Sequence, residues 1–136
     1  MNETMTVLLF RALYSRLGLL ENARWRRFRR DWLFSKRTDG RCEMCGDEVW
    51  FWADRNKNLD PMKRATLDHI IPKYYIFKFG WIDLLYDEDN FELMCKACNV
   101  NKGFAFPREL STDLMEKLQQ AANSSDLTPK SIRDRL

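Results

Sequence analysis

Two pairs of cysteines are the first residues in this sequence with a defined chemistry. Cys42 and Cys45 form one Cys-x-x-Cys unit, and Cys95 and Cys98 form a second unit after 49 intervening residues. Two residues between cysteines let both sulfur atoms reach one tetrahedral ion from a tight turn, and two such turns complete its coordination. We expect the four cysteines to bind one structural zinc ion, with free thiols as the less common alternative.

A second set of candidate ligands carries oxygen atoms instead of sulfur. Asp68 offers a carboxylate, and Asn99, directly after the second cysteine pair, offers an amide oxygen. A small number of oxygen ligands suits Mg²⁺ or Mn²⁺, with water and phosphate oxygens completing the coordination. We therefore expect a second, harder metal ion at Asp68 and Asn99.

His69 is the only histidine in the chain and directly follows Asp68. Consecutive side chains on a strand point to opposite faces, so we expect Asp68 to face the metal ion and His69 to face the place where water attacks. A lone histidine is usually structural or merely exposed, but an imidazole can also take a proton from water, as phosphodiester hydrolysis requires.

These motifs together resemble the HNH endonuclease family, in its branch with a zinc-stapled core. The residues that carry the resemblance are Asp68-His69-Ile70-Ile71-Pro72, Asn90-Phe91-Glu92-Leu93 and Cys95-x-x-Cys98-Asn99-x-x-Lys102-Gly103, within residues 41–106. The resemblance implies an α+β fold with a small ββα-metal core. The sequence departs from the family pattern in two respects. The third motif position is Asn99 rather than a histidine, a variant that the family also uses, and the loop between His69 and Asn90 is longer and more aromatic than is usual.

The resemblance further implies a role for each residue of the site. His69 would be the general base, and Asp68 and Asn99 would bind a catalytic Mg²⁺ or Mn²⁺ ion. Asn90 would orient His69 through its backbone carbonyl. Lys102 would lie near the phosphate of the nucleic acid.

Basic residues are concentrated near the start of the chain. Residues 11–37 carry nine basic and two acidic residues, a net charge of +7, whereas the rest of the chain sums to −4. Five arginines lie within seven residues: Arg24, Arg26, Arg27, Arg29 and Arg30. Clustered guanidinium groups suit contacts with phosphates, although many charged runs are only solvated helix faces. We expect this segment to bind DNA.

Apolar spacing places the elements that must position these residues. It predicts helices at 6–20 and 21–36, whose stripe of Trp25, Phe28 and Trp32 fits core packing better than base stacking. We expect a strand hairpin of residues 49–52 and 63–71, short helical turns over 74–86 broken at Gly80, and a strand at 91–94. Further helices should begin near residue 98, at Pro107 and near residue 128.

Three regions follow from this pattern. Residues 1–37 should form a basic helical arm, an N-terminal helical hairpin packed on the core. Residues 38–106 should form the nuclease core with its zinc knuckles, and residues 107–136 a C-terminal helical extension. No stretch reaches the ~18 apolar residues of a membrane span. Because Arg11 and Arg16 interrupt the apolar run at 5–20, we expect no signal peptide, and a cytoplasmic protein with reduced thiols.

The sequence therefore indicates a divalent-metal-dependent HNH endonuclease acting on DNA, of the kind met in phages, mobile elements or restriction and defence systems. The alternative is a non-catalytic zinc-stabilised module that binds nucleic acid or an assembly. A third interpretation is a nuclease that is active only within a complex. A homodimer or a larger nucleoprotein assembly is compatible with each of these.

Overall fold

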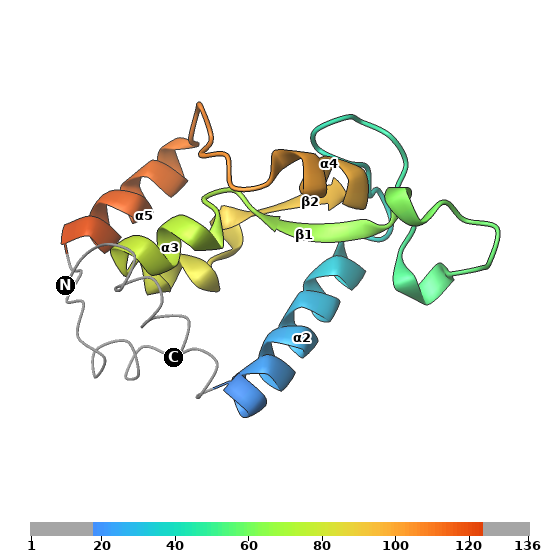
Figure 1. The fold of residues 1–136 in the computed structure, drawn as a ribbon, viewed down its shortest axis with the longest axis horizontal. Coiled ribbons are helices and arrows are strands. Elements are labelled where there is room, and N and C mark those ends of the chain that lie inside the picture. Colours follow the sequence, from blue (N-terminus) through green and yellow to red (C-terminus); the bar gives the residue numbers. More distant parts are fainter. Residues whose placement is uncertain (1–17, 124–136) are drawn as a thin grey trace.

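A computed structural model describes the backbone of residues 18–123 and the side chains of residues 23–123 (Figure 1). Its elements follow in the order α2 (Gly18–Ser35), the 3-10 turns η1 (Trp52–Asp54) and η2 (Pro61–Lys63), β1 (Ala65–His69), α3 (Lys73–Phe79), the 3-10 turns η3 (Ile82–Leu85) and η4 (Glu88–Asn90), β2 (Phe91–Cys95), α4 (Lys96–Lys102) and α5 (Thr112–Asn123). This mixture of helices with one small sheet confirms the α+β class.

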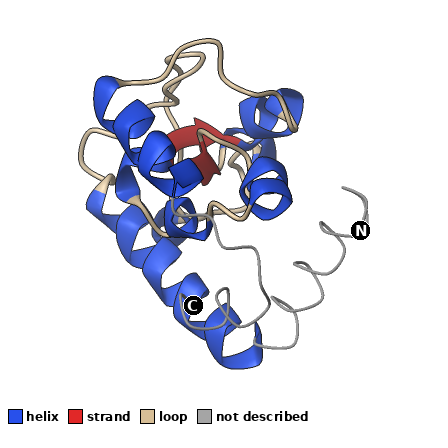
Figure 2. Ribbon diagram, turned by 90° about the vertical axis from the view of Figure 1, so that its left-hand side faces the viewer, coloured by secondary structure: helices blue, strands red, loops and turns tan. Residues whose placement is uncertain are grey.

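The centre of the fold is an antiparallel ribbon of β1 and β2. Its register sets Asp68 opposite Glu92 and His69 opposite Phe91. Because side chains alternate along a strand, His69 and Phe91 share one face while Asp68 and Glu92 share the other. α2 packs on the first face and α4 on the second, so that helices enclose the two strands (Figures 1 and 2).

The aromatic stripe of α2 forms the core beneath the ribbon. Trp25 and Trp32 are buried, and their rings meet the edge of Phe91 with centroid distances of 6.0 and 5.8 Å. Edge-to-face contacts of this kind add to the free energy gained from burying the rings. The interpretation of the stripe as core is confirmed, and the arginines of α2 face away from it.

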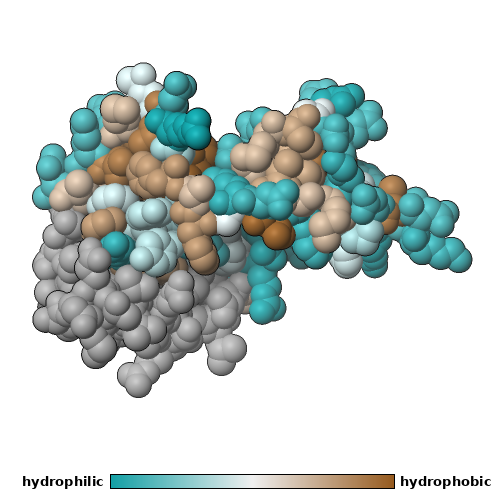
Figure 3. All heavy atoms as spheres, turned by 45° about the horizontal axis from the view of Figure 1, so that its top comes forward, coloured by the Kyte–Doolittle hydropathy of each residue, from teal (hydrophilic) through white to brown (hydrophobic). Residues whose placement is uncertain are grey.

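A second hydrophobic cluster lies beyond the His69 end of the ribbon, where α3, η3 and α5 meet. Its fully buried members include Ile71, Ile76, Leu84 and Leu114. Gly80 ends α3 with a positive φ of 71°, which confirms the predicted break there. Figure 3 shows brown, hydrophobic surface over this lobe and a mainly hydrophilic projection at the opposite end of the molecule.

The predicted hairpin of residues 49–52 with 63–71 is wrong. β1 pairs with β2 instead, and the 49–52 segment contributes only an isolated parallel bridge between Trp50 and Arg64. Runs of β-branched and aromatic residues indicate that a segment is extended, but they do not identify the strand with which it pairs.

No helix in the described part of the chain is both long and apolar enough to cross a membrane.

Helix boundaries differ from expectation by a few residues. α4 begins at Lys96, and Cys95 caps it by accepting a hydrogen bond from the Cys98 amide. α5 begins at Thr112 rather than at Pro107, because the Ser111 hydroxyl accepts from the Leu114 amide at 3.1 Å and starts the helix there. The predicted helix at 6–20 lies outside the described residues except for 18–20, which form the start of α2, and the helix predicted near 128 lies outside them.

Candidate active site

The four cysteines come together at one end of the ribbon. Their sulfur atoms all lie within 4.8 Å of one another, and the Sγ atoms of Cys45 and Cys95 are 4.0 Å apart. A tetrahedron with Zn–S bonds of about 2.3 Å has S–S edges of about 3.8 Å, so the donor set fits zinc. The prediction that these four residues are placed to bind one metal ion is confirmed.

The surroundings of the sulfur atoms also suit a cation. Burial alone would raise the pKa of Cys42, but hydrogen bonds from backbone amides lower it to about 6. The neighbouring sulfur of Cys95 raises the pKa of Cys98 to about 12, as expected when several thiols compete for negative charge in one place. A divalent ion would remove this repulsion by binding all four thiolates.

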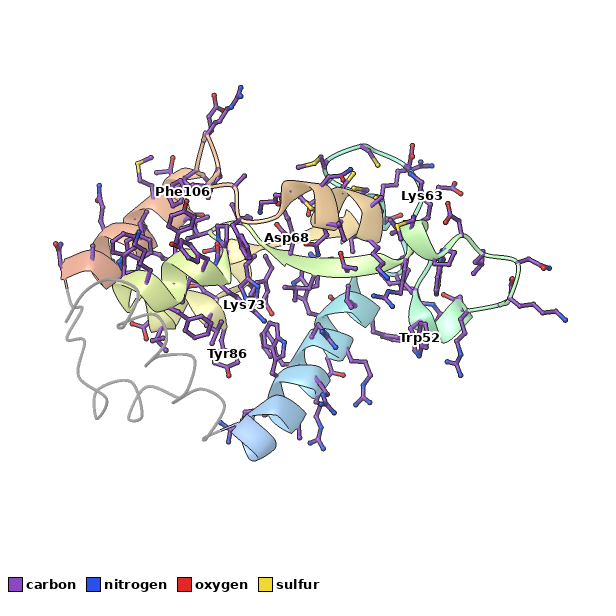
Figure 4. The ribbon with its side chains drawn as sticks, viewed as in Figure 1. Trp52, Lys63, Asp68, Lys73, Tyr86 and Phe106 are labelled. Carbon is purple, nitrogen blue, oxygen red and sulfur yellow. The ribbon has the colours of Figure 1, made fainter. Side chains whose placement is uncertain are left out.

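Asp68 projects from the other face of the ribbon toward α4 (Figure 4). It is buried and contacts the ammonium group of Lys102, which also donates to the His69 carbonyl at 2.9 Å and the Ile70 carbonyl at 3.2 Å. Glu92 Oε1 lies 3.4 Å from the same nitrogen. We call these four oxygen atoms the oxygen cage: Asp68 Oδ2, the carbonyls of His69 and Ile70, and Glu92 Oε1. Because the Lys102 ammonium group lies inside it, the cage suits a positive charge.

Glu92 gives the cage a second carboxylate. Burial and the nearby carboxylate of Asp68 raise the pKa of Glu92 to about 7. The two carboxylates face each other directly across the ribbon, and two such groups repel unless a proton or a cation lies between them. Oxygen donors of this type fit Mg²⁺ or Mn²⁺.

Thr66 fixes the orientation of the Asn99 amide. The Thr66 hydroxyl donates its hydrogen to the Met94 carbonyl at 2.8 Å. It can therefore only accept from Asn99, whose Nδ2 lies 2.9 Å away. Asn99 Oδ1 is left without a hydrogen bond among the described residues, which keeps it available as a ligand. Asp68 and Asn99 lie at the same face of the ribbon, but Asp68 contacts Lys102 and Asn99 donates to Thr66.

His69 is held in one tautomer. Its Nε2 lies 3.0 Å from the Leu85 carbonyl. A carbonyl oxygen can only accept, so Nε2 carries the hydrogen of the neutral ring and Nδ1 is left as the basic nitrogen. Burial lowers the pKa of His69 to about 4, which keeps the ring neutral at pH 7.

The expected open face of His69 is absent from this conformation. The residue is only 7% exposed, and its ring centroid lies 5.5 Å from Trp25 and 5.2 Å from Phe91. The Lys73 ammonium lies 5.2 Å from the centre of the Trp25 ring. Trp25 thus covers the imidazole, and the prediction of a water-facing ring is wrong for the structure described.

Asn90 orients the surroundings of His69 rather than its ring. Its backbone carbonyl accepts from the Ile70 amide at 2.8 Å, so it is not the predicted partner of the imidazole. Its buried side chain accepts from Ile71 N at 2.7 Å and donates to Ile71 O and to Leu84 O, at 3.3 and 3.1 Å. Asn90 therefore fixes the turn that presents the Leu85 carbonyl to His69.

The predicted nucleic-acid contacts divide into two groups. Arg24, Arg26, Arg27, Arg29 and Arg30 are all exposed on α2, as contact with phosphates would require. Lys102 is instead enclosed by the oxygen cage. Sequence reasoning missed the roles of Thr66, Glu92 and the Leu85 carbonyl. Only Glu92 lies within a motif that the sequence singled out, Asn90-Phe91-Glu92-Leu93, and its place opposite Asp68 follows from the strand register of the structure.

Comparison with known proteins agrees with this geometry. The family model of the HNH endonuclease matches residues 42–104. No curated protein and no solved structure matches the chain significantly. The matched stretch contains both cysteine pairs, β1, α3, β2 and α4, while α2 and α5 lie outside it. The match of residues 42–104 to the HNH endonuclease family points to a nuclease or another nucleic-acid-related function.

Proposed function

We propose that the chain is a divalent-metal-dependent endonuclease that hydrolyses DNA phosphodiester bonds. The observation that carries the proposal is the arrangement around His69. The Leu85 carbonyl holds the hydrogen of the His69 ring on Nε2, which leaves Nδ1 as the basic nitrogen. The backbone carbonyl of His69 belongs to the oxygen cage with Asp68 and Glu92. A base and a cation site are thus held on the two sides of one residue.

His69 would take the proton from the attacking water at Nδ1. As that O–H bond breaks, the water oxygen bonds to phosphorus and the bond to the 3′ oxygen breaks, which leaves a 5′ phosphate and, after proton transfer, a 3′ hydroxyl. The Leu85 carbonyl would stabilise the imidazolium through the Nε2 hydrogen. Asn90 would keep that carbonyl in place through its bond to Leu84.

Asp68 and Asn99 would hold the Mg²⁺ or Mn²⁺ ion, with Glu92 as a further oxygen donor. A bound ion would stabilise negative charge on the phosphate and on the departing 3′ oxygen. Lys102 neutralises the same carboxylates in the structure described, and Thr66 turns Asn99 Oδ1 away from itself.

Access to His69 would depend on α2. The ring that covers the imidazole, Trp25, lies on the same helix as the exposed arginines. Water reaches Nδ1 only if Trp25 yields, so we infer that contact between α2 and the DNA backbone accompanies the opening of the site. The arginines supply the charge for that contact.

The test is cleavage of plasmid DNA in the presence of Mg²⁺ or Mn²⁺. His69→Ala should lower the rate by about 10²–10⁴-fold, the usual contribution of a general base. Asn101→Ala, an exposed change on the same helix as Asn99, should leave the rate unchanged. Equal cleavage by the wild type and by His69→Ala would refute the assignment.

One observation favours a second function. Because His69 is covered and the oxygen cage already contains Lys102, the structure also suits a zinc-stabilised module that binds nucleic acid without cutting it. Tight DNA binding without cleavage, under every divalent metal tried, would establish this alternative.

A further inference from the structure

A groove of about 820 Å³ runs along the edge of β1 that does not pair with β2. α2 forms one wall and the η1 segment forms the other. Thr66 and Asn99 line the groove, so it reaches the face of the ribbon where the oxygen cage lies. A ligand in this groove would therefore extend from the arginine helix to the candidate active site.

The groove is strongly basic. Its lining contains five arginines and no carboxylate: Arg26, Arg27, Arg29, Arg30 and Arg64. None of the five forms an ion pair with another residue in the part of the chain that the structure describes. Arg24, the remaining arginine of the cluster, does not line it. An uncompensated charge of this size suits a phosphodiester backbone.

Trp52 forms a built aromatic surface at the edge of the groove (Figure 4). It is 60% exposed and stacks on Trp50, with a centroid distance of 6.0 Å and an interplanar angle of 25°. Trp50 is itself fixed, because its Nε1 donates to the Asp60 carbonyl at 2.7 Å. The guanidinium carbons of Arg55 and Arg64 lie 5.1 and 6.0 Å from the centre of the Trp52 ring.

Exposed aromatic rings beside arginines distinguish two forms of nucleic acid. A duplex keeps its bases stacked inside and offers phosphates, for which arginines alone suffice. An unpaired strand also offers the faces of its bases, which stack on aromatic side chains. Phe34, on the α2 wall, is 60% exposed as well, so that both walls of the groove present an aromatic ring.

We propose that the groove binds an unpaired segment of the DNA substrate, with the phosphates of its backbone contacting the arginines and one base stacked on the Trp52 ring. The substrate class is then DNA with a single-stranded region next to the cleavage site. The inference rests on the proposed function for the choice of DNA as the nucleic acid. It does not require that the chain be catalytic.

The test measures binding without added divalent ions, so that cleavage does not interfere. Fluorescence anisotropy of labelled oligothymidylate is compared with that of a duplex of equal length. The wild type and His69→Ala should both bind the single strand more tightly than they bind the duplex. Trp52→Ala should weaken single-strand binding by about tenfold or more, the usual effect of losing one stacked base, and duplex binding much less.

Two further variants make the result specific. Arg64→Gln should weaken binding to both forms, since it removes a phosphate contact. Phe104→Ala, an exposed aromatic outside the groove, should change neither, and thermal melting checks that each variant is folded. Equal affinity for both forms, or an unchanged affinity in Trp52→Ala, would overturn the proposal. So would a change in self-association, rather than in DNA binding, when Trp52 is replaced.

The two proposals fail in different ways. Single-strand binding that depends on Trp52, without cleavage under any metal, would refute the nuclease and leave the groove assignment standing. Metal-dependent cleavage that depends on His69, with binding indifferent to Trp52, would refute the groove and leave the nuclease standing.

Discussion

The imidazole of His69 determines whether the proposed chemistry is available, and its surroundings keep it uncharged. Burial lowers its pKa, and the Leu85 carbonyl fixes its hydrogen on Nε2. A neutral ring is the form that accepts a proton, so a low pKa is compatible with a general base. An imidazole with a low pKa is, however, a weaker base. The burial that lowers the pKa of His69 includes the Trp25 ring, so the position of Trp25 affects how strong a base His69 is.

Titration of His69 should show this directly. As the chain has a single histidine, NMR gives one imidazole signal, and we expect it to titrate near pH 4 instead of near 6.5. The unfolded chain then binds more protons between these values, so stability conferred by the neutral ring is complete above pH 6.5 and lost as the pH falls toward 4. A midpoint near 6.5 would contradict the buried position.

The same shift can be read from stability. Protonation of His69 should cost about 2 kcal/mol of unfolding free energy between pH 7 and pH 5. Glu92, with its raised pKa, has the opposite sign. The informative quantity is therefore the difference between the wild type and His69→Gln in denaturant unfolding, which should shrink by this amount as the pH falls.

Thr66 offers a second prediction at the level of single residues. Thr66→Val keeps the shape of the side chain but removes the acceptor that orients the Asn99 amide. Mn²⁺ affinity, measured by electron paramagnetic resonance, should fall about 10-fold or more, as for other residues that orient metal ligands. Thr66→Ser keeps the hydroxyl and should bind like the wild type. Unchanged affinity in Thr66→Val would remove Asn99 from the proposed site.

At the level of elements, local features were predictable and the partner of a strand was not. The break at Gly80 and the inward stripe of α2 follow from short-range chemistry, and the meeting of the two distant cysteine pairs follows from the four ligands that one zinc ion requires. The pairing of β1 with β2 does not, because a strand pattern carries no information about its partner. The Leu85 carbonyl beside His69 also has no signature in the sequence, since every residue carries a carbonyl group.

α2 should control access to His69. Diethyl pyrocarbonate modifies neutral imidazole, and with one histidine the reaction reports on His69 alone. Trp25→Leu should speed the modification by removing the ring above the imidazole. Trp32→Leu is the matched control, because Trp32 is buried on the same helix and contacts Phe91. Equal acceleration by both variants would mean that α2 has loosened as a whole.

At the level of the whole molecule, a small amount of sheet holds a large part of the site. β1 carries Asp68 and His69, β2 carries Glu92, and an isolated two-stranded ribbon is marginally stable at best. The cysteines lie at the end of the ribbon away from His69, where Cys95 ends β2 and caps α4. Glu43, between the cysteines of the first pair, donates from its amide to the Leu93 carbonyl at 2.8 Å and so joins that pair to β2.

Zinc should therefore be required for the folded core. Structural zinc contributes about 10–16 kcal/mol, which matches or exceeds the total stability of about 5–15 kcal/mol of an ordinary domain. Metal analysis should give one zinc per chain, and Cys45→Ser or a strong chelator should abolish the cooperative melting transition. Met44→Ser changes an exposed residue between the same two cysteines and should melt like the wild type. A zinc-free chain that melts as the untreated protein does would show that the ribbon is held by its two helices alone.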